Sequence, residues 1–314
     1  MGTAEDRIIS YLNAQGIFRH PVTYEKINVG ASGAKLFLLT DGKSKYVLKN
    51  AHSSYHSDAG HIASYQRELA FYRLNRKNRF SFVPETLYLE DHPDYGVLLV
   101  MRYYHPIQHA EWNEALLHKA VDLCARLHST KGSALADLGL RYNHVAINRE
   151  ATNRALEAWK QVARQHEGAL EPKVIEDIYR DIEMVCPVLN AEPHFICHGD
   201  FHPENILTDG ENLFLCDWQG IGIGKGIGDI SFFIGRALGF GIALPADELL
   251  DCYCSLLSQY RNETIDKQVL LKEKAAANLL NTFSFWAYHL QNKALDRVLP
   301  LYRDMAESYH YLRR

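Results

Sequence analysis

The sequence predicts an α+β protein with two lobes, a small antiparallel-sheet lobe followed by a large, mostly helical lobe. Two observations point to this class. Five short β-rich runs, separated by turn residues, lie before residue 104, whereas the apolar residues after residue 105 recur mostly at helical spacing. With 47% hydrophobic residues among 314, the chain has enough apolar material for a sizeable core. We therefore expect an N-terminal lobe over residues 1–104 and a C-terminal lobe over residues 105–314.

The N-terminal lobe is expected to begin with a helix. Thr3 and Asp6 have the spacing of a capping box, the apolar residues Ile8 and Leu12 follow one turn apart, and Gly16 is a stop signal. The remaining elements are expected in this order: three antiparallel strands over residues 22–50 with a hairpin turn at residues 41–42, a helix over residues 61–76, and two strands over residues 86–90 and 96–101. Together these strands predict a five-stranded antiparallel sheet.

The C-terminal lobe is expected to consist mainly of amphipathic helices. These helices span residues 111–128, 149–166, 174–189, 230–238, 246–260, 266–289 and 295–312. Two short apolar strands interrupt the helical pattern, at residues 194–197 and 213–217, with a hairpin turn at Asp209 and Gly210 between them.

The composition excludes several classes of protein. The formal net charge is −4, so the chain has no basic surplus with which to hold nucleic acid. Its six cysteines form no CxxC pair, which disfavours a disulfide scaffold and a zinc site. No segment has the apolar length of a membrane span, and the acidic N-terminus lacks a signal core. We expect a soluble cytoplasmic protein that binds neither nucleic acid nor membrane; its oligomeric state stays open.

The run HGDFHPEN at residues 198–205 is the most informative segment. It is followed twelve residues after Asn205 by Asp217 at the end of an apolar strand. Phosphoryl transfer from a nucleotide needs a carboxylate beside the acceptor hydroxyl and oxygen ligands for Mg²⁺, and protein kinases supply them as an Asp, an Asn five residues later and an Asp after a hairpin. The spacing therefore predicts Asp200 as the catalytic carboxylate and Asn205 and Asp217 as the magnesium ligands.

The HGDxHxxN run with the downstream Asp217, Trp218 and Gln219 resembles the aminoglycoside phosphotransferase family. The resemblance extends from about Val22 to the last helices. It implies a protein-kinase-like fold and an enzyme that uses ATP and magnesium to phosphorylate a hydroxyl of a small molecule, such as an aminoglycoside-like antibiotic or another amino alcohol or sugar. It also implies that His198 and His202 support the catalytic loop.

The N-terminal lobe contains residues that fit this family. Lys49 closes the third strand, and Glu68 lies on the following helix; the resemblance implies that Lys49 contacts the nucleotide phosphates and that Glu68 is its ion-pair partner. Ser32 and Gly33, in the small-residue turn between the first two strands, are expected to bring backbone amides to the phosphates.

The segment that joins the lobes is expected to meet the purine base. Met101 and Tyr103 lie there. A second interpretation stays open, in which the side chains of this segment simply belong to the core and to the interface between the lobes. No side chain there distinguishes ATP from GTP. Asp229 follows a glycine-rich run and is expected to cap the helix that begins at Ile230, while the resemblance implies that its carboxylate braces the catalytic loop.

The acceptor is expected to be a small molecule. Residues 218–228, between Asp217 and Asp229, contain no Ser, Thr or Tyr that could be phosphorylated and are too few for a peptide platform. Two alternatives stay open, a kinase that acts on protein side chains and a nucleotide-binding pseudokinase.

The chemical class of the acceptor also has two interpretations. In the first interpretation, the acidic residues of the C-terminal part line a pocket and favour a cationic acceptor. In the second, these acidic residues are solvated, and aromatic residues line a pocket for a neutral acceptor. The acids are Asp247, Glu248, Asp251, Glu263 and Asp266, and the aromatic residues are Trp286, Tyr288 and Tyr302.

Overall fold

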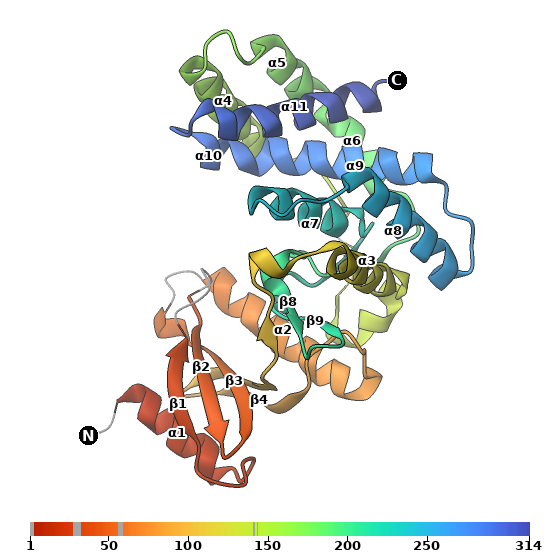
Figure 1. Cartoon of the computed structure of the whole chain (residues 1–314). Helices are drawn as coiled ribbons and strands as arrows, with labels where there is room; N and C mark the ends of the chain where they lie inside the picture. The colour runs from red at the N-terminus through yellow and green to blue at the C-terminus, as the bar shows by residue number, and fades with distance from the viewer. Residues whose placement is uncertain (1–2, 28–32, 56–58, 141, 143) are drawn as a thin grey trace.

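The computed structural model describes residues 3–27, 33–55, 59–140, 142 and 144–314. It contains an antiparallel sheet at the N-terminal end and a stack of helices towards the C-terminal end, which confirms the α+β, two-lobed class (Figure 1). Among the described residues, no helix is both long and apolar enough to cross a membrane.

The N-terminal sheet has five strands in the order β1-β2-β3-β5-β4, and each strand is antiparallel to its neighbours. The strands are β1 (Thr23–Ile27), β2 (Lys35–Asp41), β3 (Ser44–Ala51), β4 (Thr86–His92) and β5 (Gly96–Arg102). The helix α1 (Ala4–Ala14) is capped by Thr3 and buries Ile8, Ile9 and Leu12 against this sheet. All the elements expected in this part of the chain are therefore confirmed.

The helix α2 (Ala59–Asn78) follows β3 and connects the sheet with the rest of the molecule. Its residues Phe71, Tyr72 and Leu74 are buried in the same hydrophobic cluster as Ile206 and Leu215, which lie on short strands of the C-terminal part. The proposed division between residues 104 and 105 stays a prediction, because this helix is shared by both cores.

The C-terminal helices mostly match the expected ones, but two of the expected helices are interrupted. They are α3 (Glu114–Ser129), α4 (Arg149–Gln165), α5 (Pro172–Asp181), α6 (Val185–Asn190), α7 (Ile227–Gly239), α8 (Ala246–Arg261), α9 (Lys267–Asn281), α10 (Ala287–Leu290) and α11 (Leu295–Leu312). The helix expected over residues 174–189 is broken between α5 and α6, because Pro187 has no N–H to donate to the carbonyl of Glu183 and its ring crowds that carbonyl. The helix expected over residues 266–289 is interrupted by a π-helix, Thr282–Trp286.

Five very short strands lie around the HGDFHPEN run at residues 198–205. They are β6 (His105–Pro106), β7 (Phe195–Cys197), β8 (Ile206–Thr208), β9 (Leu213–Leu215) and β10 (Gly222–Gly224). Only β7 and β9 were expected, because strands of two or three residues are too short for a periodic pattern and β10 is rich in glycine, which is uncommon in strands. Pairing of β10 with β7 and of β8 with β9 brings the two halves of the motif together.

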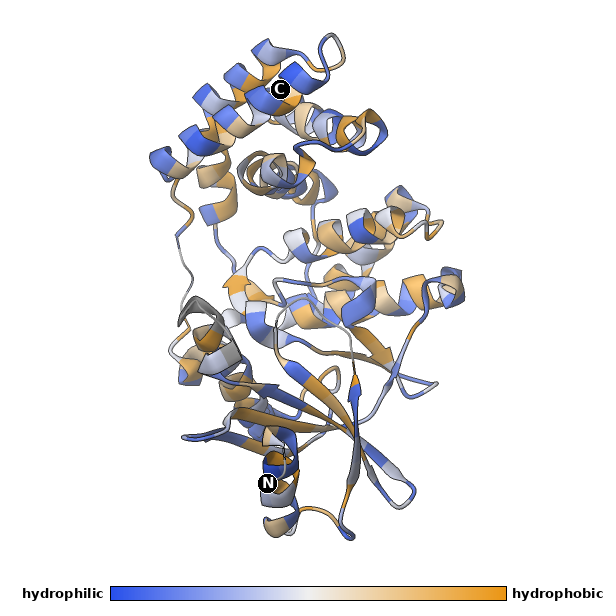
Figure 2. Cartoon of the chain, turned by 90° about the vertical axis from the view of Figure 1, so that its left-hand side faces the viewer, coloured by the Kyte–Doolittle hydropathy of each residue, from blue (hydrophilic) through white to orange (hydrophobic). Residues whose placement is uncertain are grey.

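The apolar residues of the C-terminal part pack in two large clusters. One surrounds β7, β8 and β9 and is covered by α3, α7 and α8, while the other lies among α4, α5, α6, α10 and α11. The helix α9 contributes Leu270 to the first cluster and Ala276 and Leu279 to the second. Figure 2 shows hydrophobic and hydrophilic residues alternating along these helices, as amphipathic helices require.

Candidate active site

The hairpin of β8 and β9 brings Asn205 next to the strand that leads to Asp217. Ile206 is paired with Leu215, and the next backbone bond runs from the N–H of Cys216 to the carbonyl of Asn205 over 3.0 Å. Asp217 follows directly. The two residues predicted as magnesium ligands therefore lie at the same end of one hairpin.

The side chain of Asp200 is fixed through one of its two oxygens. Asn205 donates its Nδ2 to the Asp200 carbonyl at 2.9 Å and to Oδ2 at 3.1 Å, and His202 Nε2 lies 3.5 Å from the same Oδ2. The backbone N–H of Glu204 donates to His202 Nδ1, so a neutral His202 carries its proton on Nε2, facing Asp200. Among the described residues, none donates to Asp200 Oδ1, and 45% of the side chain is exposed.

The pKa of Asp200 is lowered in this environment. Burial alone would raise the pKa of the carboxyl, but the hydrogen bond and charge of His202, helped by His198 and Asn205, outweigh it. The Asp200 carboxylate is therefore ionised at neutral pH, as a group that accepts a proton must be.

Lys49 lies between two carboxylates. Its Nζ is 2.7 Å from Glu68 Oε2 and 2.8 Å from Asp217 Oδ1, and the Lys49 and Glu68 side chains are 8% and 2% exposed. Burial alone would lower the pKa of the ammonium, but Glu68 and Asp217 raise it above its ordinary value. A charged ammonium, supported by Glu68, thus faces the expected metal ligand.

Asp217 has a backbone conformation that non-glycine residues seldom adopt, with φ +65° and ψ +58°. Such left-handed residues cost free energy and persist where neighbouring contacts hold them. Its Oδ1 accepts hydrogen bonds from Lys49 and from Gln219 Nε2 at 2.7 Å, while no described residue donates to Oδ2. The unusual backbone therefore presents a carboxylate with one oxygen occupied and one available.

Asp229 braces the catalytic loop, residues 198–205, through hydrogen bonds to its backbone. Its carboxylate accepts from the backbone N–H of His198 at 2.6 Å, from that of Gly199 at 3.0 Å and from His128 Nε2 at 3.1 Å. Burial alone would raise its pKa, but these partners hold the pKa below its ordinary value. The bracing contact that the family resemblance implied is therefore present in the structure.

The expectation that Asp229 caps a helix at Ile230 is wrong. The helix α7 begins three residues earlier, at Ile227, because Gly226 adopts φ +79° and turns the chain into it. Asp229 lies inside the first turn. Gly226 is also required by packing, since a Cβ there would be 2.7 Å from the His128 ring.

Two features keep the loop that carries Asp200 close to the residues on either side of Asp217. His198 accepts the Asp200 N–H with Nδ1 and therefore, when neutral, donates Nε2–H to the carbonyl of Cys216 at 3.0 Å. Gly199 has φ +81°, and a Cβ there would lie 2.3 Å from the carbonyl oxygen of Gly220, so no larger residue fits.

His128, Cys197 and Asp229 bring three possible metal-ligand atoms within 4.8 Å of one another. However, the Asp229 oxygens already accept three hydrogen bonds, and His128 Nδ1 is 2.7 Å from the Tyr253 hydroxyl. These donors and acceptors are satisfied by one another, so the group is a brace and not a metal centre.

The other predicted nucleotide-binding residues lie outside these contacts. Ser32 lies outside the described residues, and Gly33 is exposed just before β2 with φ +79°. Met101 is a core residue of β5, as the second interpretation of this segment expects, and the Tyr103 backbone N–H donates to the carbonyl of Lys45. Contact of this segment with a purine base stays a prediction.

The five acidic residues considered for a cationic pocket are all exposed. Asp251 pairs with Lys267, and Asp266 caps α9 through the N–H of Gln268. These contacts fit solvated helix surfaces, and they give no support to a carboxylate-lined pocket at these positions.

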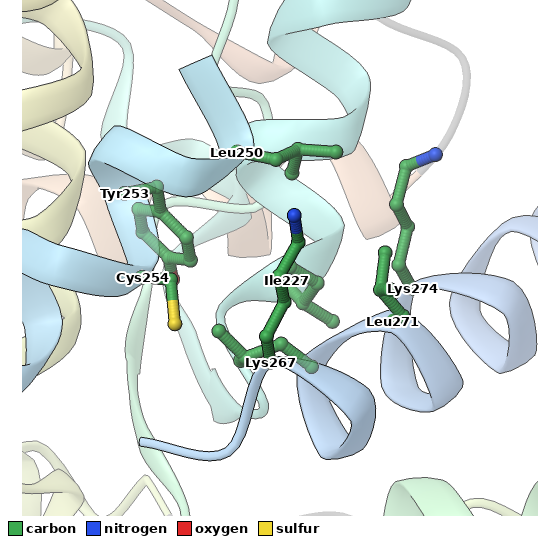
Figure 3. Close-up of a pocket in the computed structure, with 8 residues that line it drawn as sticks. Ile227, Leu250, Tyr253, Cys254, Lys267, Leu271 and Lys274 are labelled. Carbon is green, nitrogen blue, oxygen red and sulfur yellow. The ribbon is translucent and has the colours of Figure 1, made fainter. Parts of the chain in front are cut away.

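In the described part of the chain, hollows lie among the C-terminal helices. A cavity of about 10 Å³ between α7, α8 and α9, lined by Ile227, Tyr253 and Lys267 among others, has room for no more than one water molecule (Figure 3). A shallow depression of about 430 Å³ lies between α4 and α10. Tyr288, one of the three aromatic residues considered for an acceptor pocket, lines this depression, while Tyr302 is buried in the core.

Two contacts of the site were not predicted from the sequence. Gln219 contacts Asp217, and His128 contacts Asp229. A signal for His128 exists, since it lies four residues after Cys124 on the apolar face of an amphipathic helix, where a polar residue needs a buried partner.

The chain is similar to proteins that transfer phosphoryl groups. The model of the family described as "Phosphotransferase enzyme family" matches residues 23–250. No curated protein matches the sequence. A candidate aminoglycoside phosphotransferase from Ralstonia eutropha is 15% identical, with a TM-score of 0.62 over 98% of both chains.

Two further solved structures share the architecture. Choline kinase from Cryptosporidium parvum is 15% identical, with a TM-score of 0.60 over 98% of this chain and 94% of its own. Spectinomycin phosphotransferase, solved with ADP and spectinomycin, is 15% identical, with a TM-score of 0.61 over 98% of this chain and 97% of its own. These likenesses confirm the protein-kinase-like fold expected from the sequence.

Proposed function

Because the chain belongs to the phosphotransferase enzyme family, we propose that it transfers the γ-phosphoryl group of ATP to a hydroxyl of a small molecule, with Mg²⁺ as cofactor. GTP is the alternative donor. The observation that supports the proposal is the convergence of Lys49, Asp217, Asn205 and Asp200 on one end of the β8–β9 hairpin, with the Asp200 side chain 45% exposed.

The donor atoms suit magnesium and phosphate. Asn205 turns its Nδ2 towards Asp200, so its Oδ1 faces away, and Asp217 keeps Oδ2 free of hydrogen bonds from described residues. Carboxylate and amide oxygens are the ligands that Mg²⁺ prefers. The Lys49 ammonium adds a positive charge beside them that Glu68 holds in place.

Each residue has a defined part in the transfer. When bound, Mg²⁺ neutralises the triphosphate and orients its γ-phosphoryl group. Lys49 turns an N–H towards the phosphates, and Asp200 Oδ1 orients the acceptor hydroxyl and receives its proton. The acceptor oxygen forms the new bond to phosphorus as the bond from phosphorus to the β–γ bridging oxygen breaks, and ADP departs. Positioning and charge neutralisation supply most of the acceleration.

The test is a panel assay with the purified protein. ADP release in the presence of ATP and Mg²⁺ is measured against cationic, neutral and anionic hydroxyl compounds, and ³¹P NMR identifies the phosphorylated product. The Asp200→Asn variant is the control for contaminating kinases. Labelling of peptides in preference to small molecules would favour a protein kinase, whereas nucleotide binding without turnover across the panel would favour a pseudokinase.

A further inference from the structure

Three residues on one face of α2 contact the short segment after Asp217. Ser64, Arg67 and Glu68 are spaced i, i+3 and i+4, so their side chains leave the same side of the helix. Glu68 Oε1 accepts the N–H of Trp218 at 3.1 Å, Ser64 Oγ donates to Gln219 Oε1 at 3.1 Å, and Arg67 lies 3.4 Å from the carbonyl of Gln219. The helix that carries Glu68 is thus attached to both residues that follow Asp217.

The side-chain amide of Gln219 lies between α2 and Asp217. Its Nε2 donates to Asp217 Oδ1 at 2.7 Å, and its Oε1 accepts from Ser64. The reverse orientation would place the amide oxygen against a carboxylate oxygen, with no hydrogen between them, so the orientation is fixed by its partners.

We propose that Gln219 is a positioning residue for Asp217: it holds Oδ1 so that Oδ2 is the oxygen presented to the divalent cation, and it ties that oxygen to α2. This inference rests on the proposed function, because it assumes that Asp217 binds the metal.

Gln219 suits this role better than Lys49, which bonds to the same oxygen. The ammonium of Lys49 is the group expected to turn towards the phosphates of a bound nucleotide, whereas the Gln219 amide is held by Ser64 and stays. Gln219 also lies in a 3₁₀ turn, Trp218–Gly220, directly after the left-handed Asp217, so its backbone is constrained on both sides.

The test measures metal-dependent nucleotide binding in three variants. Gln219→Leu removes both hydrogen bonds at similar size, Gln219→Glu replaces the donor with a carboxylate, and Ser64→Ala removes the partner on α2. Gln66→Leu is the matched control, because Gln66 lies on the same helix and bonds to the exposed Asp91 instead. Calorimetry gives the ADP affinity with and without Mg²⁺, and Mn²⁺ titration followed by electron paramagnetic resonance gives the metal affinity directly.

Groups that orient metal ligands typically contribute 10- to 100-fold to metal affinity. We expect Gln219→Leu to weaken metal binding about 10-fold, Gln219→Glu to weaken it at least as much, Ser64→Ala to weaken it less, and Gln66→Leu to match the parent. Metal-free ADP affinity should not change in any of them, and thermal melting confirms that each variant is folded.

Two results would overturn the inference while leaving the proposed function intact. Parental metal affinity in Gln219→Leu would show that Asp217 needs no such support. Tighter metal binding in Gln219→Glu would show that residue 219 is itself a ligand. A parent protein without any metal-dependent nucleotide binding would instead remove the proposed function, and the inference with it.

Discussion

Asn205 donates its side-chain amide to both the carbonyl oxygen and Oδ2 of Asp200, at 2.9 and 3.1 Å. One residue therefore fixes the proposed base, and its remaining oxygen is the one proposed as a metal ligand.

Replacing Asp200 by Asn should lower turnover by roughly 10²-fold or more, because removal of a general base usually costs this much. Nucleotide affinity should stay near the parental value, since Asp200 contacts neither Lys49 nor Asp217 in the described contacts. Single-turnover rates and ADP calorimetry separate the two quantities. Weakened ADP binding with an unchanged rate per bound complex would mean that Asp200 and Asp217 exchange roles.

Replacing Asp217 by Asn should remove the magnesium dependence of ADP binding and abolish turnover, because an amide is a poor substitute for a carboxylate on a hard cation. The measurement is the ADP affinity across a series of Mg²⁺ concentrations. An unchanged magnesium dependence would exclude Asp217 from the metal site.

Lys49→Met should lower both turnover and stability. It leaves the 2%-exposed Glu68 side chain without its ion-pair partner, and breaking a buried pair from one side costs about 3 kcal/mol of unfolding free energy. The double variant Lys49→Met with Glu68→Gln removes the unpaired charge, so it should regain much of the stability but none of the turnover. Chemical denaturation and initial rates test the two parts. Restored turnover in the double variant would contradict the phosphate-binding role of Lys49.

Asp229→Asn should destabilise the protein by about 2 kcal/mol, because an amide nitrogen then faces a hydrogen-bond donor in a buried position. Asp304→Asn, an exposed carboxylate on α11, is the matched control and should change stability by less than about 0.5 kcal/mol. The folded-state pKa of Asp229 lies below the unfolded value of about 3.9, so its charge stabilises fully above that pH and progressively less as pH falls through the folded-state pKa. Denaturation at several pH values should therefore show the difference from the parent shrinking below about pH 4.

His202→Leu should shift the pH dependence of catalysis. The His202 ring lowers the pKa of Asp200, so its removal should raise that pKa and move the acidic limb of the pH–rate profile to higher pH. The measurement is kcat/KM for the acceptor between pH 4 and 9, with His310→Leu, an exposed residue of α11, as the control. A limb that stays in place would show that Asp200 is not the group titrating there.

Much of the fold could be predicted because local signals and tertiary structure agree. Thr3 caps α1, the β2–β3 turn falls at Gly42, and the interval from Asp200 to Asn205 is a local spacing that the sequence displays directly. The family resemblance supplied the pairing of Lys49 with Glu68, which no local spacing reveals, since the two residues lie on different elements.

The rest depends on contacts that no periodicity records. Gly226 adopts a positive φ angle, so α7 begins at Ile227 and not at Ile230. Asp229 is therefore not the cap of the helix, and it contacts the catalytic loop from the first helical turn. Gln219 accepts a hydrogen bond from Ser64, which lies 155 residues away in the sequence. This contact exists only once α2 has packed against the β8–β9 hairpin. An acceptor site among the C-terminal helices stays a prediction, because its shape would depend on how several of these helices pack together.

The division of the C-terminal core into two clusters has a consequence for how such a protein can diversify. Because α9 is the helix that contributes to both clusters, the block formed by α4, α5, α6, α10 and α11 meets the catalytic half mainly through one shared helix. Recombination between relatives with crossovers before α4, after α6 and within α9 would exchange that block while keeping Asp200, Asn205 and Asp217 in their native packing. Chimeras made in this way would keep the proposed phosphoryl-transfer residues constant while the helical block varies.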